Sequence, residues 1–467
     1  RKLPAPATAP PNALSDKIID YRGLIARSTE GFVGRAWVRN EVDRFLRAAA
    51  PRTFLLRGEP GSGKTSFMAD LVERRGYPHH FIGKGSLSGV VASLDWRNPI
   101  RFAESLGYQL LRDYGGWIMD WESWGIEVRQ DVRDLQGLLI GSAVKTFEAL
   151  PRPANRPALS VAQEVKRFGE AAGAVGVYIE NFQIAPEQVV RQLLTVPLTR
   201  IAQRWPEQPL VLVVDGLDEA VSYSDPRRNI LHLLPNGSLP PNVRLLLSSR
   251  PGDHLSHDFL QQVHPCWLSE DEQGQQHPGA IEDAKVYVVR LTQEPPVRAM
   301  LEEPALDAEL LGEEVAKASR GNFLYLYHYA QGLRGGDKTL LDVKALPQGL
   351  YGIYGNFLRK IKNEVADVVY WDRTVKPVLG ALAVAREPLT RDQIARFSGV
   401  GQSSAGTLLS LIGQFLAPSG PDKPARHKLY HPSFGEYVIS EENQDYVSGR
   451  EAHARFVAVY QGEAKTW

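Results

Sequence analysis

The sequence has one cysteine, Cys266, among 467 residues, which excludes an internal disulfide framework. No apolar run approaches the roughly 20 residues that a membrane-spanning helix needs, so we expect no membrane domain. Lysine and arginine balance aspartate and glutamate at 54 each, so no overall charge favours nucleic acid or an anionic membrane. There is also no signal peptide, and together with the lone cysteine this predicts a cytoplasmic protein.

A glycine-rich stretch stands out from this ordinary composition: Gly58-Glu-Pro-Gly-Ser-Gly-Lys64-Thr65-Ser66. It follows an apolar run over 53–57 and opens a helix-compatible stretch over 66–74, the strand, loop and helix context of a P-loop. We expect the loop amides and the helix N-terminus to bind phosphate oxygens. Lys64 can reach the β- and γ-phosphates, and the Thr65 hydroxyl can ligate Mg²⁺. The predicted phosphate-binding residues are Gly58, Pro60, Gly61, Ser62, Gly63, Lys64, Thr65 and Ser66.

A second apolar run leads into Asp215-Gly-Leu-Asp218-Glu219. A carboxylate at the end of a parallel strand points into the ligand crevice, so Asp215 is expected to hold Mg²⁺ with Thr65. Asp218 or Glu219 could position an attacking water, and Arg250, after a third apolar run, could contact the γ-phosphate. Asp218, Glu219 and Arg250 are therefore the candidate catalytic residues. The alternatives are an acidic loop that caps a buried strand and an arginine held in a structural ion pair.

These strands alternate with stretches of helical periodicity, which predicts an α/β domain with a parallel sheet. The long interval between Lys64 and Asp215 leaves room for an insertion over about 115–185. Beyond about residue 270 the pattern is helical. In that part Thr390-Arg-Asp-Gln393 has the form of a capping box, and a second helix is expected over 404–415.

Three segments together resemble the NACHT branch of the STAND NTPases, which are signal-transducing switch ATPases: Gly58–Ser66, 212–220 and 246–251. Two shorter motifs add to the resemblance. Phe32-Val33-Gly-Arg35 resembles the motif that family members place beside the adenine, which implies that Val33 and Arg35 bind nucleotide. Gly321-Asn-Phe323 resembles the segment of the following helical domain that closes over the base, which implies the same for Phe323.

A histidine completes the resemblance. The segment Leu429-Tyr-His431-Pro-Ser resembles the histidine motif of the family's winged helix, which touches the β-phosphate of ADP and locks the closed state. The implied domains are an N-terminal linker or helix (1–27), a P-loop domain (28–268), a helical domain (269–350), a winged helix (351–442) and the start of a helical or repeat region (443–467).

The resemblance implies an ATP/ADP switch in antiphage or innate immune signalling. ADP would hold a closed monomer, ATP exchange would open it into a homo-oligomer, and slow hydrolysis would reset it. It also implies an effector domain before Arg1 and, beyond residue 467, a sensor for a protein trigger.

Two other classes stay open: the switch ATPase of a transcription regulator, and a scaffold that retains ADP without turnover. No lysine or arginine lies between Gln402 and Phe415, where a recognition helix would need them, so we do not expect DNA binding there.

Overall fold

The computed structural model describes residues 18–82, 97–114, 190–220, 230–234, 239–269, 271, 273–302, 306–417 and 425–464, and the backbone of short strands between 126 and 183. The expected N-terminal linker lies outside the described residues up to position 17. The chain divides into two compact units. The first, here called the sheet unit, comprises Arg1–Glu30, Val42–Leu55 and Met68–Pro265. The second, called the helical unit, comprises Gly31–Glu41, Leu56–Phe67 and Cys266–Trp467.

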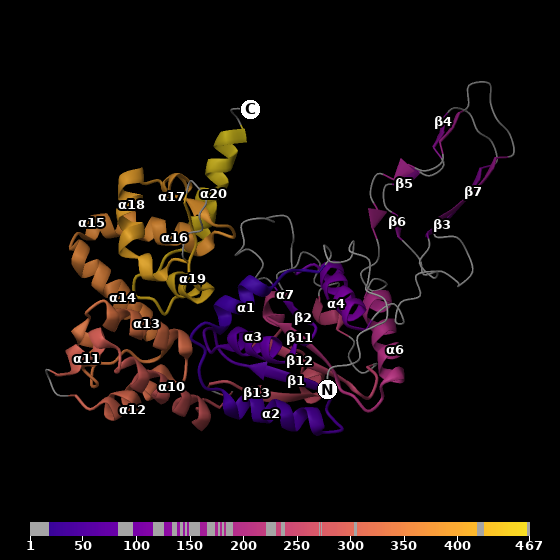
Figure 1. Cartoon of the computed structure of the whole chain (residues 1–467). Helices are drawn as coiled ribbons and strands as arrows, with labels where there is room; N and C mark the ends of the chain where they lie inside the picture. The colour runs from indigo at the N-terminus through magenta and orange to yellow at the C-terminus, as the bar shows by residue number, and fades with distance from the viewer. Residues whose placement is uncertain are drawn as a thin grey trace. The chain divides into compact units, whose positions relative to one another are not determined.

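A five-stranded sheet has the order β13 (Val263–Trp267), β1 (Thr53–Arg57), β12 (Val243–Ser249), β11 (Leu210–Asp215) and β2 (His79–Phe81) (Figure 1). β11 pairs in parallel with both β12 and β2. All residues of β11 and β12 are buried, as expected of uninterrupted apolar strands in a sheet covered on both faces. Val214 lies opposite Leu247 in the register, so these two strands end at the same edge. The expected α/β architecture is confirmed at this level.

Strand β13 was not predicted from the sequence, because Pro265 interrupts its short apolar pattern. Its place at the end of the strand order explains why the proline is tolerated, since an edge strand has a row of amides that need no ladder partner. The same strand carries Cys266, which is buried. Burial raises the pKa of this thiol to about 12.

Helices accompany the strands in the first half of the chain: α1 (Arg22–Thr29), α2 (Ala36–Arg47), α3 (Lys64–Arg75), α4 (Pro99–Tyr114), α6 (Val196–Arg204), α7 (Leu217–Ala220), α8 (Ile230–Leu233) and α9 (His257–Gln261). A short π-helical segment, η5 (Arg191–Thr195), precedes α6. α4 packs beside β2, and its Phe102, Leu106 and Leu110 recur every four residues to fill the core of the sheet unit (Figure 1). Helix α1 begins at Arg22, inside the N-terminal segment that was expected to be a linker or a helix.

The described part of the expected 115–185 insertion consists of short strands: β3 (Ile126–Val132), β4 (Leu138–Ile140), β5 (Ala143–Val144), β6 (Phe147–Glu148), β7 (Leu159–Val165), β8 (Gly173–Val175), β9 (Tyr178–Ile179) and β10 (Phe182–Gln183). They form two-stranded parallel pairs, β3 with β7, β4 with β8, β5 with β9 and β6 with β10. Each strand of the first half of the segment therefore pairs with one of the second half.

The helical unit is built mainly from α10 (Pro278–Leu291), α11 (Pro295–Glu302), α12 (Ala308–Ser319), α13 (Phe323–Arg334), α14 (Gly349–Val365), α15 (Val368–Tyr370), α16 (Lys376–Val384), α17 (Arg391–Ser398), α18 (Gln402–Leu411), α19 (Pro432–Val438) and α20 (Gly449–Ala464). Shorter turns are η6 (Lys338–Leu341), η7 (Trp371–Val375) and η8 (Gly413–Phe415). α10, α12 and α13 pack together, α16 packs with α17, α19 and α20, and α14 contacts both groups (Figure 1).

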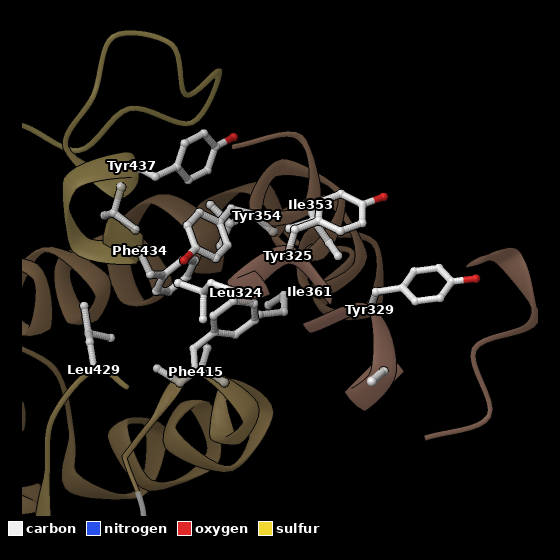
Figure 2. Packing of buried hydrophobic residues seen from close by; sticks show 14 of the residues in the cluster. Leu324, Tyr325, Tyr329, Ile353, Tyr354, Ile361, Phe415, Leu429, Phe434 and Tyr437 are labelled. Carbon is white, nitrogen blue, oxygen red and sulfur yellow. The ribbon is translucent and has the colours of Figure 1, made fainter. Parts of the chain in front are cut away.

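One hydrophobic core runs through the helical unit. Figure 2 shows Leu324, Tyr354, Phe415 and Phe434 gathered in it from α13, α14, η8 and α19. The rings of Phe415 and Phe434 are stacked at 4.3 Å. Because each of these large side chains is removed from water, each contributes roughly 1.5–3 kcal/mol of hydrophobic stabilisation.

The expected capping box at Thr390 and Gln393 is confirmed, with the Thr390 hydroxyl accepting from the Gln393 amide and the Gln393 side chain accepting from the Thr390 amide. The following helix was placed slightly wrongly: α18 begins at Gln402 rather than Ser404 and ends at Leu411. Strand β14 (Leu389–Thr390) pairs antiparallel with β15 (Arg426–His427) beside these helices.

Candidate functional site

The glycine-rich loop joins β1 to α3, as its spacing predicted, and α3 begins at Lys64. Gly61 and Gly63 have φ angles of +78° and +94°, in the region that favours glycine. A Cβ on Gly61 would also lie 2.4 Å from the Cβ of Leu324. With the first amides of α3 lacking intrahelical partners, the loop has the form of an anion-binding nest at a helix N-terminus.

The loop carbonyls are held from outside by three different donors. The Pro60 oxygen accepts from the Asn322 side-chain amide at 2.8 Å, and the Gly61 oxygen accepts from the Leu324 backbone amide at 3.0 Å. The Ser62 oxygen accepts from the Arg35 guanidinium at 2.8 Å. In a trans peptide the C=O and the following N–H point in opposite directions. The anchored Pro60 and Ser62 carbonyls therefore direct the Gly61 and Gly63 amides away from Asn322 and Arg35.

Two polar side chains of the loop, those of Lys64 and Ser62, differ in their surroundings. The Lys64 ammonium donates to the carbonyl oxygens of Gly58, at 2.6 Å, and Glu59, at 3.1 Å. The Ser62 hydroxyl is fully buried, and its oxygen has no hydrogen-bond partner among the described residues. A lysine that closes the loop on neutral carbonyls can exchange them for a phosphate, which is a stronger, charged acceptor.

Arg35, which donates to the Ser62 oxygen of the loop, is itself almost completely buried, with 1% of the residue exposed. Besides the Ser62 oxygen it donates to the Leu268 oxygen at 2.8 Å, and its guanidinium carbon lies 4.7 Å from the centre of the Phe323 ring. Burial lowers the pKa of Arg35 to about 10, against the opposing effects of Asp283 and Cys266, so it stays charged at neutral pH. Its described contacts make Arg35 a scaffold for the loop, whereas Val33 and Phe323 are partly exposed.

Asp283 on α10 is a residue of this site that the sequence reasoning missed. Its Oδ2 accepts from the Arg35 backbone amide at 2.9 Å and from the Trp37 indole N–H at 3.1 Å. The Trp37 ring is stacked on His277 at 3.7 Å. The pKa of His277 is lowered, mainly by burial and then by Arg35, which favours the neutral ring in this stack. Asp283 thus fixes the backbone at Arg35, whose φ of +58° is unusual for a side-chain-bearing residue.

The predicted acidic residues lie in the sheet unit. Asp215 ends β11 and is completely buried, and its Oδ1 accepts from the Ser248 hydroxyl at 2.5 Å. The same hydroxyl oxygen accepts from the Gly216 amide at 2.9 Å. Ser248 therefore orients both the carboxylate and the turn that follows it, which is a support the sequence did not reveal.

Asp218 and Arg250 are joined in the sheet unit by two interactions. The Arg250 amide donates to Asp218 Oδ1 at 3.1 Å, and the Arg250 Nε lies 3.1 Å from Asp218 Oδ2. Glu219 follows on the short helix α7 and is partly exposed. The structure therefore joins two of the three candidate catalytic residues, Asp218 and Arg250, in an ion pair.

His431 lies at the start of α19 in the helical unit. Its Nδ1 accepts from the Ser433 backbone amide at 3.2 Å and lies 2.7 Å from the Ser433 hydroxyl. That hydroxyl also lies 2.8 Å from the phenol of Tyr354 on α14. These contacts make His431 the N-cap of α19.

Among the described residues, no cluster of three or more histidine, cysteine, aspartate or glutamate side chains could hold a metal ion. Hydroxyl and carboxylate oxygens, the groups that Thr65 and Asp215 carry, are oxygen ligands of the kind that Mg²⁺ prefers. In the part of the chain that the structure describes, no helix is long and apolar enough to cross a membrane.

Comparisons with known proteins do not assign this chain to a family. No family model matches the chain, and no curated protein matches it. Among solved structures, a chain from the structure of Drosophila ORC bound to DNA is similar over 89% of this chain and 98% of its own length, at 12% identity and a TM-score of 0.29. A TM-score this low assigns neither a fold nor a function.

Proposed function

We propose that the chain is a P-loop ATPase that works as a nucleotide-dependent switch. The observation that carries the proposal is the anchoring of the Pro60, Gly61 and Ser62 carbonyls by outside donors. It directs the Gly61 and Gly63 amides to the opposite face of the loop, at the N-terminus of α3, where the diphosphate of ADP or the triphosphate of ATP would bind.

Each loop residue then has a role. Gly58, Pro60, Gly61, Ser62, Gly63 and Ser66 form the cradle for the phosphates. Lys64 leaves the Gly58 and Glu59 carbonyls for the β- and γ-phosphates. Val33 and Phe323 line the base, and Arg35 keeps the loop in shape. Mg²⁺, assigned to Thr65 and Asp215, neutralises charge on the phosphates when bound.

We assign hydrolysis to the acidic segment after β11. Asp218 or Glu219 positions the attacking water, and Arg250 contacts the γ-phosphate. Arg250 is paired with Asp218, so its guanidinium would have to reorient to contact the γ-phosphate. The slow, regulatory rate is proposed from the resemblance to switch ATPases.

The switch itself is the further part of the proposal. Residues 351–442 would form a winged helix, with α17, α18 and the β14–β15 pair as its parts, and His431 would bind the β-phosphate of ADP. ADP would hold a closed monomer, and ATP exchange would release His431 and expose a homo-oligomerisation surface. The sequence motifs that resemble STAND proteins support cytoplasmic signalling in immunity or antiphage defence, started by a protein trigger.

The first test is to denature the purified protein and identify any released nucleotide by chromatography. Stoichiometric ADP in the wild type, and none in Lys64→Ala, is the expected result. An empty wild-type site with rapid turnover of added ATP would contradict the switch and leave an ordinary ATPase. Retained ADP without any turnover would favour the scaffold alternative.

A further inference from the structure

A single side chain, that of Asn322, joins the phosphate loop to the start of α13. Its Oδ1 accepts from the Leu324 and Tyr325 amides, at 3.0 and 3.2 Å, and so caps the helix. Its Nδ2 donates to the Pro60 oxygen at 2.8 Å. The side chain is buried, with 7% exposed, so both of its functional groups are satisfied by protein.

We infer that Asn322 is a positioning residue that couples the phosphate loop to α13. The Nδ2 bond fixes the Pro60 carbonyl and thereby the direction of the Gly61 amide. The Leu324 amide, shared between Asn322 Oδ1 and the Gly61 oxygen, adds a second connection at the same place. The loop conformation that would bind a phosphate therefore stabilises the capped first turn of α13, and the capped turn stabilises that loop conformation in return.

The next turn of α13 carries the coupling onward. The Tyr327 ring is stacked on Tyr430 at 4.9 Å, and His328 is stacked on Phe415 at 4.4 Å. Tyr430 directly precedes His431, and Phe415 lies in the core that Figure 2 shows between α13, α14 and α19. A change at the loop is thus passed over about one and a half helix turns to the segment that carries His431.

Variants at position 322 can separate the coupling from simple helix capping. Asn322→Ser keeps an N-cap oxygen but is too short to reach the Pro60 carbonyl. Asn322→Asp keeps both shape and cap but replaces the donor with an acceptor. Asp307→Ala is the matched control, because it removes the N-cap of α12 in the same unit without touching the loop.

The experiment measures ADP affinity and the amide hydrogen exchange of the loop and of residues 322–334, in the chain of residues 1–467. This inference rests on the proposed nucleotide binding for its first readout. Asn322→Ser should bind ADP about tenfold more weakly, since a buried carbonyl loses its partner. Asn322→Asp should bind at least as weakly, and Asp307→Ala should bind like the wild type.

Hydrogen exchange without nucleotide keeps the two proposals distinguishable. Asn322→Ser should raise exchange in both 58–66 and 322–326, and Asp307→Ala in neither. Failure of the wild type to bind ADP, with this joint rise present, would refute the proposed function and support the coupling. Wild-type ADP affinity in Asn322→Ser, or exchange that rises in α13 alone, would overturn the coupling.

Discussion

The guanidinium of Arg35 donates to the carbonyl oxygen of Ser62 at 2.8 Å, so a buried cation is hydrogen-bonded to the glycine-rich loop. Its second donor holds the Leu268 oxygen, so one rigid, forked side chain supports two backbone segments. A charge in this position would favour an anion on the loop, although the guanidinium itself is hydrogen-bonded to the protein.

Arg35→Lys tests this supporting role. One ammonium cannot replace the fork, so a buried carbonyl loses its partner, and the free energy of unfolding should fall by about 2 kcal/mol. Urea unfolding measures the loss. Arg334→Lys, at a surface pair with Glu294, is the control and should change stability by less than about 0.5 kcal/mol. Unchanged stability of Arg35→Lys, with nucleotide affinity lost, would instead make Arg35 a direct ligand contact.

Lys64→Ala should weaken ADP binding by about 100-fold, because a charged hydrogen-bond donor to phosphate is lost. Isothermal titration calorimetry measures the affinity. Lys317→Ala, whose ammonium pairs with Glu314 on the surface, should bind ADP like the wild type. Tight ADP binding by Lys64→Ala would refute the P-loop assignment.

Asp218→Asn and Glu219→Gln together identify the residue that positions water. The variant that removes it should turn over ATP roughly 10²- to 10⁴-fold more slowly, with ADP affinity nearly unchanged. Steady-state phosphate release gives the rate. If both variants hydrolyse ATP like the wild type, the acidic segment is structural, and the Asp218–Arg250 pair only fixes the loop.

His431→Ala should speed ADP release and favour self-association if the histidine binds the β-phosphate. The substitution also removes the N-cap of α19, so His431→Asn, which restores a capping oxygen, is the necessary partner variant. Both variants should lose ADP faster than the wild type, as followed by a fluorescent nucleotide and by light scattering. Rapid release in the alanine variant alone would show that capping, and not phosphate binding, is the role of His431.

His328 predicts a pH dependence of stability. Burial among aromatic rings lowers its pKa to about 3, far below the 6.5 of an exposed histidine. Below pH 6.5 the unfolded chain binds a proton that the folded one does not, so stability falls as pH falls, by about 1.4 kcal/mol per unit.

In unfolding experiments from pH 7 to 5, the wild type should therefore lose about 2 kcal/mol more than His328→Phe. Equal losses in the two proteins would show that His328 does not stay neutral in the folded state.

The sequence predicted the sheet well where a physical signal was local. β11 and β12 are built around apolar runs, and the glycine-rich loop is specified by glycine spacing between a strand and a helix. β13 was missed because it is a strand only by virtue of its position at the edge of the sheet. A five-residue segment that contains a proline has neither the apolar content nor the periodicity that would predict a strand.

The supports of the site were missed for a similar reason. Asn322 and Pro60 are 262 residues apart, and Arg35 and Asp283 are 248 apart. An asparagine before a helix looks like an ordinary cap, and a single aspartate on a helix looks like a surface charge. Only the folded backbone shows that each also holds a loop.

The burial of Cys266 makes the protein well suited to site-specific labelling. A thiol with a pKa of about 12 is almost entirely protonated at neutral pH, and alkylating reagents react with the thiolate. A cysteine introduced at an exposed position such as Tyr460 on α20 would therefore take up a maleimide dye selectively, with the native residue left in place. Fluorescence between two such positions could then follow a nucleotide-driven rearrangement one molecule at a time.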